Sequence, residues 1–325
     1  MLNLVRVILV VSVGFLSAAA SAPAISQGYP DRPIRLVIPN TPGSSPDTVA
    51  RIWAPALSRA LGQPVILDYK AGAGSLLGVE YVARNVPADG YATVFTQVND
   101  QAAFPVFVKD LRFDPLKDVL PVLAIAEAKL ILASPVQAPW NTFNEMVAHA
   151  RANPGKLNFG NPGMQSAIVL QFEAIKQQLG LDIVSVPYNG GAPFIAGIIA
   201  GQVQLGWMNV LTTTGPGKGR VKALAVTGDG RDPVYPDVPT FPEVGIAKLG
   251  GSWYTLNVPT GTPKNVIDKL NAAGNQALQQ QEVRESLSKI GFSVLGGTPE
   301  LASRNLAELA KFYADIAKNL RIEAR

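Results

Sequence analysis

The stretch from Ile34 to Asp47, IRLVIPNTPGSSPD, constrains the fold more than any other part of the chain. Its β-prone residues, Ile34 to Ile38, predict a buried strand, and the prolines and glycine that follow predict a tight loop. Ser45 is suited to cap a helix, Pro46 to its first position and Asp47 to its first turn. Such a junction directs free backbone N–H groups and the positive end of a helix dipole towards an anion. The alternative is an ordinary turn of an α/β sheet that binds nothing.

Strands and helices alternate after this opening unit. β-prone runs at residues 65–69 and 91–96 predict two further strands, with a helix between them. This alternation predicts a parallel sheet with right-handed crossovers. Ligands of such sheets bind beyond the carboxyl ends of the strands, so we expect loops 39–47, 70–75 and 96–100 to share one edge.

A second unit of the same kind begins at residue 157. Its predicted elements are strand 157–159, a glycine loop, helix 166–179, strand 183–186, helix 192–200 and strand 204–208. The junction from Asn158 to Ser166 is therefore a second candidate anion site. The helical tail after residue 262 has no such unit, and we predict that it returns to cover the first.

Two α/β units joined by two crossing segments predict a hinged solute receptor. We assign residues 25–130 and 250–325 to lobe 1 and residues 131–249 to lobe 2. The lobes are expected to open without ligand and to close around it, with hinges near residues 127–133 and 248–254.

Residues 1–24 have the pattern of a secretory signal peptide, with Arg6, an apolar run from Val7 to Leu16, and then small residues. The apolar run is shorter than the ~20 residues of a membrane span, which makes an N-terminal anchor the less favoured alternative. We therefore expect the protein to be exported to the periplasm and its leader to be cleaved.

The remaining composition excludes several kinds of chemistry. The chain has no cysteine and a single histidine, His149, so it has no thiol nucleophile and no multi-histidine metal site. Gly72, Gly74 and Gly78 resemble a dinucleotide-binding turn, but their spacing differs and no acidic residue follows at the expected distance. The formal net charge of +4 does not favour nucleic acid. We expect no cofactor, no metal and no enzymatic activity; an exported hydrolase is the alternative, without the usual nucleophile elbow.

Several segments, taken in their order, resemble the substrate-binding proteins of tripartite tricarboxylate transporters, the Bug-type periplasmic receptors. The segments are YPDRPIRLVIP, PGSSPD, LGQPVILDYKAGAGSLLG, PADGYATV, ANPGKLNFG, VPYNGGAPFIAGIIAGQVQ, VKALAV, DVPTFPEVG and WYTLNVPTGTP. The resemblance spans roughly Tyr29 to the C-terminus. It implies the fold of a periplasmic binding protein of type II-like architecture, in which each lobe is a parallel-sheet α/β sandwich.

The resemblance also implies a function. Such a receptor captures a small organic carboxylate between its lobes and delivers it to the membrane subunits of a tripartite tricarboxylate-type transporter. We expect a monomer that does not bind nucleic acid. The alternative is a receptor that passes its ligand state to a membrane sensor kinase, which the sequence does not separate from transport.

The ligand-binding residues expected from the two junctions and the resemblance come from both lobes. They are Asn40, Thr41, Pro42, Gly43, Ser44, Ser45, Asp47, Gln97 and Asn99 from lobe 1, and Gly163, Met164, Gln165, Ser166 and Asn209 from lobe 2. Asp47 is expected in the first turn of its helix rather than against the ligand, because two carboxylates repel.

This chain departs from the family pattern at four places. Ser44 replaces the second of two adjacent glycines, Gln165 stands where a glycine is usual, Val169 replaces a histidine, and Asn209 follows Met208 where an aspartate is frequent. Gln165 can donate and accept hydrogen bonds. With Asn99 and Asn209 nearby, it predicts a preference for one carboxylate on a neutral polar or aromatic body over citrate-like acids. The alternative is that Gln165 turns to solvent.

Overall fold

The computed structural model describes residues 28–321, so the predicted signal peptide lies outside the described residues. The first part of the chain contains β1 (Ile34–Ile38), α2 (Ser45–Leu61), β2 (Val65–Tyr69), α3 (Leu76–Asn85), β3 (Ala92–Gln97), α4 (Val98–Phe107) and β4 (Val119–Ala128). The middle part contains β5 (Ile131–Pro135), α5 (Phe143–Ala152), β6 (Leu157–Asn161), α6 (Ala167–Leu179), β7 (Ile183–Pro187), α7 (Gly191–Ile199), β8 (Leu205–Met208), α8 (Val210–Thr214), β9 (Val221–Val226) and the 3-10 helix η1 (Pro242–Val244). The last part contains β10 (Ser252–Pro259), α9 (Lys264–Leu278), α10 (Gln281–Lys289), β11 (Phe292–Val294) and α11 (Pro299–Leu320).

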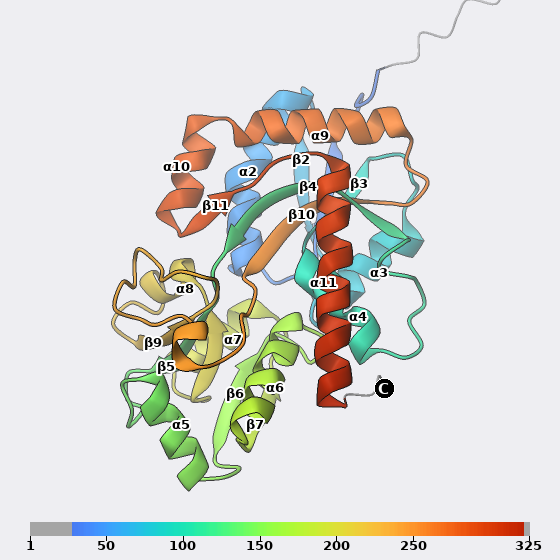
Figure 1. The fold of residues 1–325 in the computed structure, drawn as a ribbon. Coiled ribbons are helices and arrows are strands. Elements are labelled where there is room, and N and C mark those ends of the chain that lie inside the picture. Colours follow the sequence, from blue (N-terminus) through green and yellow to red (C-terminus); the bar gives the residue numbers. More distant parts are fainter. Residues whose placement is uncertain (1–27, 322–325) are drawn as a thin grey trace, which may run out of the picture.

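These elements form two sheets, one in each half of the molecule (Figure 1). The first has the strand order β11-β4-β10-β3-β1-β2, and the second has the order β7-β6-β8-β5-β9. Strand β1 pairs in parallel with β2 and β3, as the alternating pattern predicts. Strand β10 pairs antiparallel with β3 and β4, and β5 pairs antiparallel with β8 and β9. Both sheets are therefore mixed rather than purely parallel, because each receives a strand that crosses from the other lobe.

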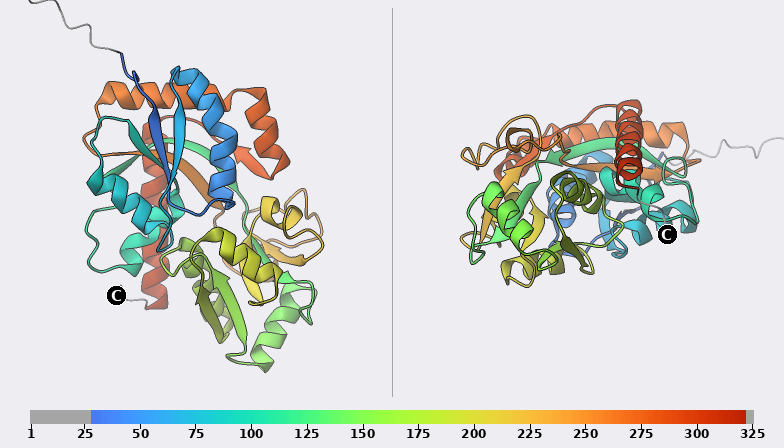
Figure 2. Two further views of the ribbon diagram at one scale, coloured as in Figure 1. Left: turned by 180° about the vertical axis from the view of Figure 1, so that it is seen from behind. Right: turned by 60° about the horizontal axis from the view of Figure 1, so that its bottom comes forward.

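The two crossings define the division of the chain. Strand β4 ends at Ala128 and β5 of the other sheet begins at Ile131. A long connection returns from β9 to β10 through η1. The predicted α/β fold of two lobes is confirmed (Figures 1 and 2). We keep residues 131 and 249 as our proposed lobe boundaries.

Helix α11 does more than cover lobe 1. It packs against α4 and β4 of lobe 1 and also against α6 of lobe 2, beside which it lies in Figure 1. Leu306 and Tyr313 of α11 share one buried cluster with Ala167 and Leu170 of α6. The last helix thus makes a third connection between the lobes, which the apolar pattern of the tail did not indicate.

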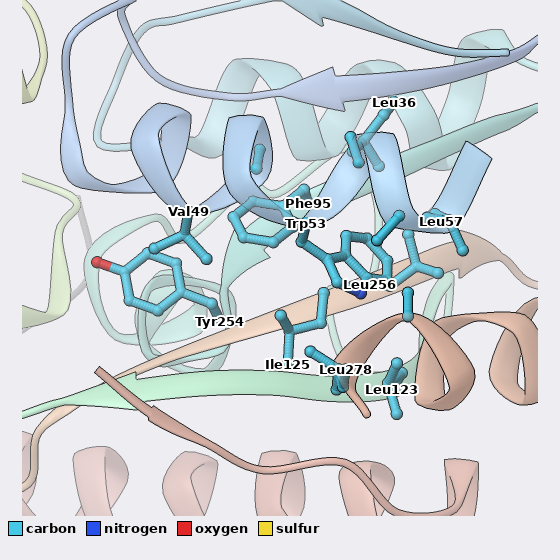
Figure 3. Packing of buried hydrophobic residues seen from close by; sticks show 14 of the residues in the cluster. Leu36, Val49, Trp53, Leu57, Phe95, Leu123, Ile125, Tyr254, Leu256 and Leu278 are labelled. Carbon is cyan, nitrogen blue, oxygen red and sulfur yellow. The ribbon is translucent and has the colours of Figure 1, made fainter. Parts of the chain in front are cut away.

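The core of lobe 1 lies between its sheet and helices α2, α9 and α10. Trp53 of α2 packs against Phe95 of β3, which stacks on Tyr254 of β10 with the ring centroids 5.9 Å apart. Figure 3 shows this cluster, with the Tyr254 hydroxyl at its outer end beside Val49. The packed rings hold β10 and α2 together where both meet the space between the lobes.

Two local predictions differ from the structure. The segment 96–100 was expected to be a loop, but β3 passes directly into α4, which begins at Val98. Neither a side-chain capping bond nor a proline marks this helix start. Helix α2 begins at Ser45, so its N-cap is Ser44 rather than Ser45, and Pro46 occupies the second helical position. Among residues 28–321, no helix combines the length and apolar character needed to cross a bilayer.

Candidate functional site

A cavity of about 60 Å³ lies between the lobes, at the carboxyl ends of β1, β3 and β8. It is lined by Asn40, Ser44, Ser45, Pro46, Gln97, Ser252 and Tyr254 from lobe 1, and by Leu130, Pro162, Ser166, Ile168, Gly191, Phe194, Ile195, Trp207, Met208, Asn209 and Thr212 from the crossing and lobe 2. None of these side chains carries a charge at neutral pH. The site therefore binds by hydrogen bonds and apolar contact, without a counter-ion from the protein.

The N-terminus of α2 faces this cavity and is open. The Ser44 side chain makes no capping bond, and Pro46 has no N–H. The N–H groups of Ser45 and Asp47 have no acceptor within residues 28–321. Uncapped first-turn N–H groups and the helix dipole together attract an anion.

The Ser44 hydroxyl is the clearest sign of a missing partner. It is 1% exposed, and its oxygen makes no hydrogen bond within the described part of the chain. Buried polar atoms are nearly always paired, by protein, by water or by a ligand. Ser44 also lines the cavity, so the unpaired hydroxyl belongs to a residue of its wall.

Asp47 holds the loop rather than the ligand. Its carboxylate accepts hydrogen bonds from the Gly43 N–H at 2.8 Å, the Arg51 Nε at 2.8 Å and the Tyr69 hydroxyl at 2.6 Å. Burial alone would raise the pKa of Asp47, but the hydrogen bonds from Tyr69, Gly43 and Arg51 hold it below its usual value. The side chain is 3% exposed and its acceptors are occupied, so it fixes the turn before α2.

Lobe 1 caps α7 of lobe 2. The Asn40 Oδ1 accepts from the Gly191 N–H at 3.1 Å, and the Thr41 Oγ1 accepts from the Ala192 N–H at 3.3 Å. An added Cβ at Gly190 would lie 2.8 Å from Thr41 Cγ2, so the loops are in close contact. The first-turn N–H groups of α7 are thus used between the lobes and not offered to a ligand.

Lobe 1 also caps α6. The carboxylate of Asp100, on α4, accepts from the Ser166 hydroxyl at 2.8 Å and the Ala167 N–H at 2.9 Å, both at the start of α6. It also accepts from the Ser75 hydroxyl at 3.2 Å. Burial raises the pKa of Asp100 to about 6, against the effect of these hydrogen bonds. The predicted second anion site is therefore occupied by a carboxylate of the protein itself.

The rest of the polar wall comes from both lobes. Asn209 Nδ2 donates to the Ser45 hydroxyl at 3.0 Å, and Gln97 Nε2 donates to the Ser252 hydroxyl at 3.0 Å. Burial raises the pKa of Tyr254 above its usual range, so its phenol is a donor at neutral pH. Within residues 28–321, no group of three or more histidine, cysteine, aspartate or glutamate side chains could hold a metal.

The structure brings together only part of the expected set. Asn40, Ser44, Ser45, Gln97, Ser166 and Asn209 line the cavity, whereas Thr41, Pro42, Gly43, Asp47, Asn99, Gly163, Met164 and Gln165 do not. Asn99 instead donates to Tyr313 and to the Gly251 carbonyl, and accepts from the Trp253 N–H. Gln165 is half-buried beside Gly74, so its contact with the ligand remains a prediction.

Several residues of the site were missing from the sequence-based set. Asp100, Gly191, Tyr254 and the apolar wall of Phe194 and Trp207 were not among the expected residues. The glycine pair before α7 was a usable signal, since it has the same strand–loop–helix form as the other junctions. No sequence signal indicated Asp100 and Tyr254, because their roles depend on how two distant segments pack.

A two-lobe α/β fold with an uncharged cavity and an open helix N-terminus between the lobes defines the class of solute-binding receptors. Residues 49–320 match the family model described as the tripartite tricarboxylate transporter family receptor. The chain belongs to this family, and the predicted resemblance is confirmed.

Individual relatives agree with this assignment. Protein BugT of Bordetella pertussis is 28% identical over 320 residues, which cover 98% of both chains. The periplasmic binding protein BugD is 29% identical, with a TM-score of 0.85 over 91% of this chain and 100% of BugD. The protein Rpa4515 of R. palustris, whose structure contains adipate, is 30% identical, with a TM-score of 0.86 over 91% of this chain and 100% of its own.

Proposed function

We propose that this protein is a periplasmic receptor that captures a small organic carboxylate and delivers it to the membrane subunits of a tripartite tricarboxylate-type transporter. The family assignment supports the receptor role, and the adipate in Rpa4515 supports a carboxylate ligand. The proposal includes export, with cleavage of the leader in residues 1–24, and action as a monomer. The receptor performs no chemistry on its ligand.

One observation carries the ligand class. The N-terminus of α2 is open towards the cavity, and the buried Ser44 hydroxyl beside it has no partner in the described chain. A ligand carboxylate placed there accepts from the Ser44 hydroxyl and from the Ser45 N–H. The helix dipole then compensates its charge without a basic side chain.

The first test is a thermal-shift screen of the mature protein against monocarboxylic, dicarboxylic, tricarboxylic and aromatic acids. A molecule that binds only the native state raises the melting temperature, by an amount that grows with concentration. We expect at least one acid to do so and its amide to fail. A screen in which no acid shifts the melting temperature would contradict the proposal.

The variant Ser44→Ala then tests the position of the carboxylate. Loss of one hydrogen bond to a charged group should weaken binding of the strongest acid by about 1.5–3 kcal/mol, measured by calorimetry. Stability should not fall, because the hydroxyl has no partner without ligand. Thr96→Val is the matched control, since the Thr96 hydroxyl is also buried and unpaired but does not line the cavity. Equal affinities for wild type and Ser44→Ala would place the carboxylate elsewhere.

A further inference from the structure

Asp100 is a buried negative charge between the lobes. It is 3% exposed, and among the described residues it forms no ion pair. Its three hydrogen bonds come from Ser75 of lobe 1 and from Ser166 and Ala167 of lobe 2. A carboxylate without a basic partner keeps its negative potential, which reaches into the surrounding low-dielectric space.

Ser166 lies between Asp100 and the cavity. It lines the cavity, but its hydroxyl donates to Asp100, and its own N–H donates to the Gly163 carbonyl. What Ser166 can offer a bound molecule is therefore the acceptor side of its oxygen. A helix N-terminus that would otherwise attract an anion here presents an acceptor with a negative charge behind it.

The two ends of the cavity consequently have opposite polarity. The start of α2 provides donors from Ser44 and Ser45, whereas the start of α6 provides the Ser166 acceptor, with Asp100 behind it. The N-terminus of α7 is also closed, because Asn40 and Thr41 cap it. The start of α2 differs from these two, because no protein carboxylate, amide or hydroxyl caps it.

We infer that Asp100 is a specificity-determining residue, whose negative charge behind Ser166 disfavours a second ligand carboxylate at the start of α6. The cleft then selects an acid with a single carboxylate at α2 and a hydrogen-bond donor, such as an ammonium or hydroxyl group, at α6. This inference rests on the proposed function and narrows its ligand class.

The test compares matched acids by calorimetry near neutral pH. The probes are butanoate, succinate and 4-aminobutanoate, with hexanoate, adipate and 6-aminohexanoate as a longer series. The wild type should bind each dicarboxylate about tenfold more weakly than its monocarboxylate, because a second negative charge meets Asp100 at low dielectric. It should bind each amino acid more tightly than the monocarboxylate.

The variant Asp100→Asn removes the charge and keeps the shape and one acceptor oxygen. Its discrimination against succinate and adipate should fall by about fivefold or more, and its preference for the amino acids should disappear. Asp232→Asn is the matched control, because Asp232 is buried in the connection between β9 and β10, away from the cavity. It should discriminate as the wild type does.

The outcomes separate this inference from the proposed function. The role of Asp100 would be overturned if wild type and Asp100→Asn showed the same affinity ratios between the matched acids, or if the wild type preferred the dicarboxylates. Either result would leave the proposed carboxylate receptor unaffected. A failure of all six probes, together with a thermal-shift screen in which no acid binds, would overturn the receptor proposal. If circular dichroism shows that Asp100→Asn is unfolded, the same affinity ratios are measured for Asp100→Ser instead.

Discussion

The pKa values of two buried aspartates at this site are shifted in opposite directions. Asp47 accepts from Arg51, Tyr69 and a backbone N–H, and its pKa is lowered. Asp100 accepts only from neutral donors, and burial raises its pKa to about 6. At Asp47 the hydrogen bonds from Tyr69, Gly43 and Arg51 outweigh the effect of burial on the pKa, whereas at Asp100 burial outweighs the hydrogen bonds.

The raised pKa of Asp100 predicts a pH dependence of stability. Between about pH 4 and pH 6 the folded state keeps a proton that the unfolded state has released, because the folded pKa is about 6 and the usual value is 3.8. The free energy of unfolding should therefore fall as pH rises through this window, by up to about 3 kcal/mol from this group.

Urea unfolding of wild type and Asp100→Asn across this range isolates the effect, because the other carboxylates are common to both. The titratable groups that face Asp100 are Tyr254 and Tyr313, and burial raises the pKa of both, so they stay protonated. The wild type should lose stability relative to the variant as pH rises. A constant difference between the two proteins would show that Asp100 keeps an ordinary pKa.

At the scale of elements, the lobes meet through the starts of their helices. The start of α6 also touches the loop before α3, where an added Cβ at Gly74 would lie 2.7 Å from the Ser166 N. Gly74 has a φ of +59°, which disfavours other residues, and it leaves no space for a side chain. This glycine is required by an interlobe contact rather than by its own turn alone.

Gly74→Ala should therefore hinder closure and weaken ligand binding. Gly180→Ala is the matched control, because Gly180 has a φ of +63° at the end of α6 but nothing within 4 Å of an added Cβ. Both variants should lose about 1–2 kcal/mol of stability from the strained backbone. Calorimetry with the strongest acid of the screen should show a loss of affinity in Gly74→Ala alone. Equal losses in both variants would mean that the contact does not contribute to closure.

At the scale of the whole molecule, the hydrogen bonds between the lobes show that the cleft is closed in this structure. Asn40, Thr41 and Asp100 of lobe 1 bond to α7 and α6 of lobe 2. The crossings 127–133 and 248–254 remain our predicted hinges, and α11 limits the motion because it packs on both α4 and α6. Opening should thus separate the loops at α2 and α7 more than the contact between α6 and α11.

Small-angle scattering tests this closure. The radius of gyration should decrease when a saturating acid is added, because the lobes close around their ligand. An acid that fails in the thermal-shift screen serves as the control and should leave the radius unchanged. A confirmed ligand that also leaves it unchanged would show that the free protein is already closed.

The local sequence was sufficient to predict the structure wherever the residues of one segment determine its conformation. The run 34–38, the breakers after it and Pro46 encode a strand, a turn and a helix start, and β1 and α2 lie where these residues predict. The repeat of this pattern after residue 157 encodes a second sheet, which is why the two-lobe fold could be inferred. The resemblance of the ordered segments to a receptor family gave the function class.

The tertiary structure decided which group accepts hydrogen bonds from the N–H groups at each helix start. The Asn158–Ser166 junction has the local form of an anion site, but Asp100 lies distant in sequence and reaches it only because α4 packs on α6. Pro162 and Ser166 of the same loop line the cavity, whereas the backbone of Gln165 lies against Gly74 of lobe 1. A helix start encodes its free N–H groups locally, whereas the group that satisfies them comes from wherever the packed chain places an acceptor.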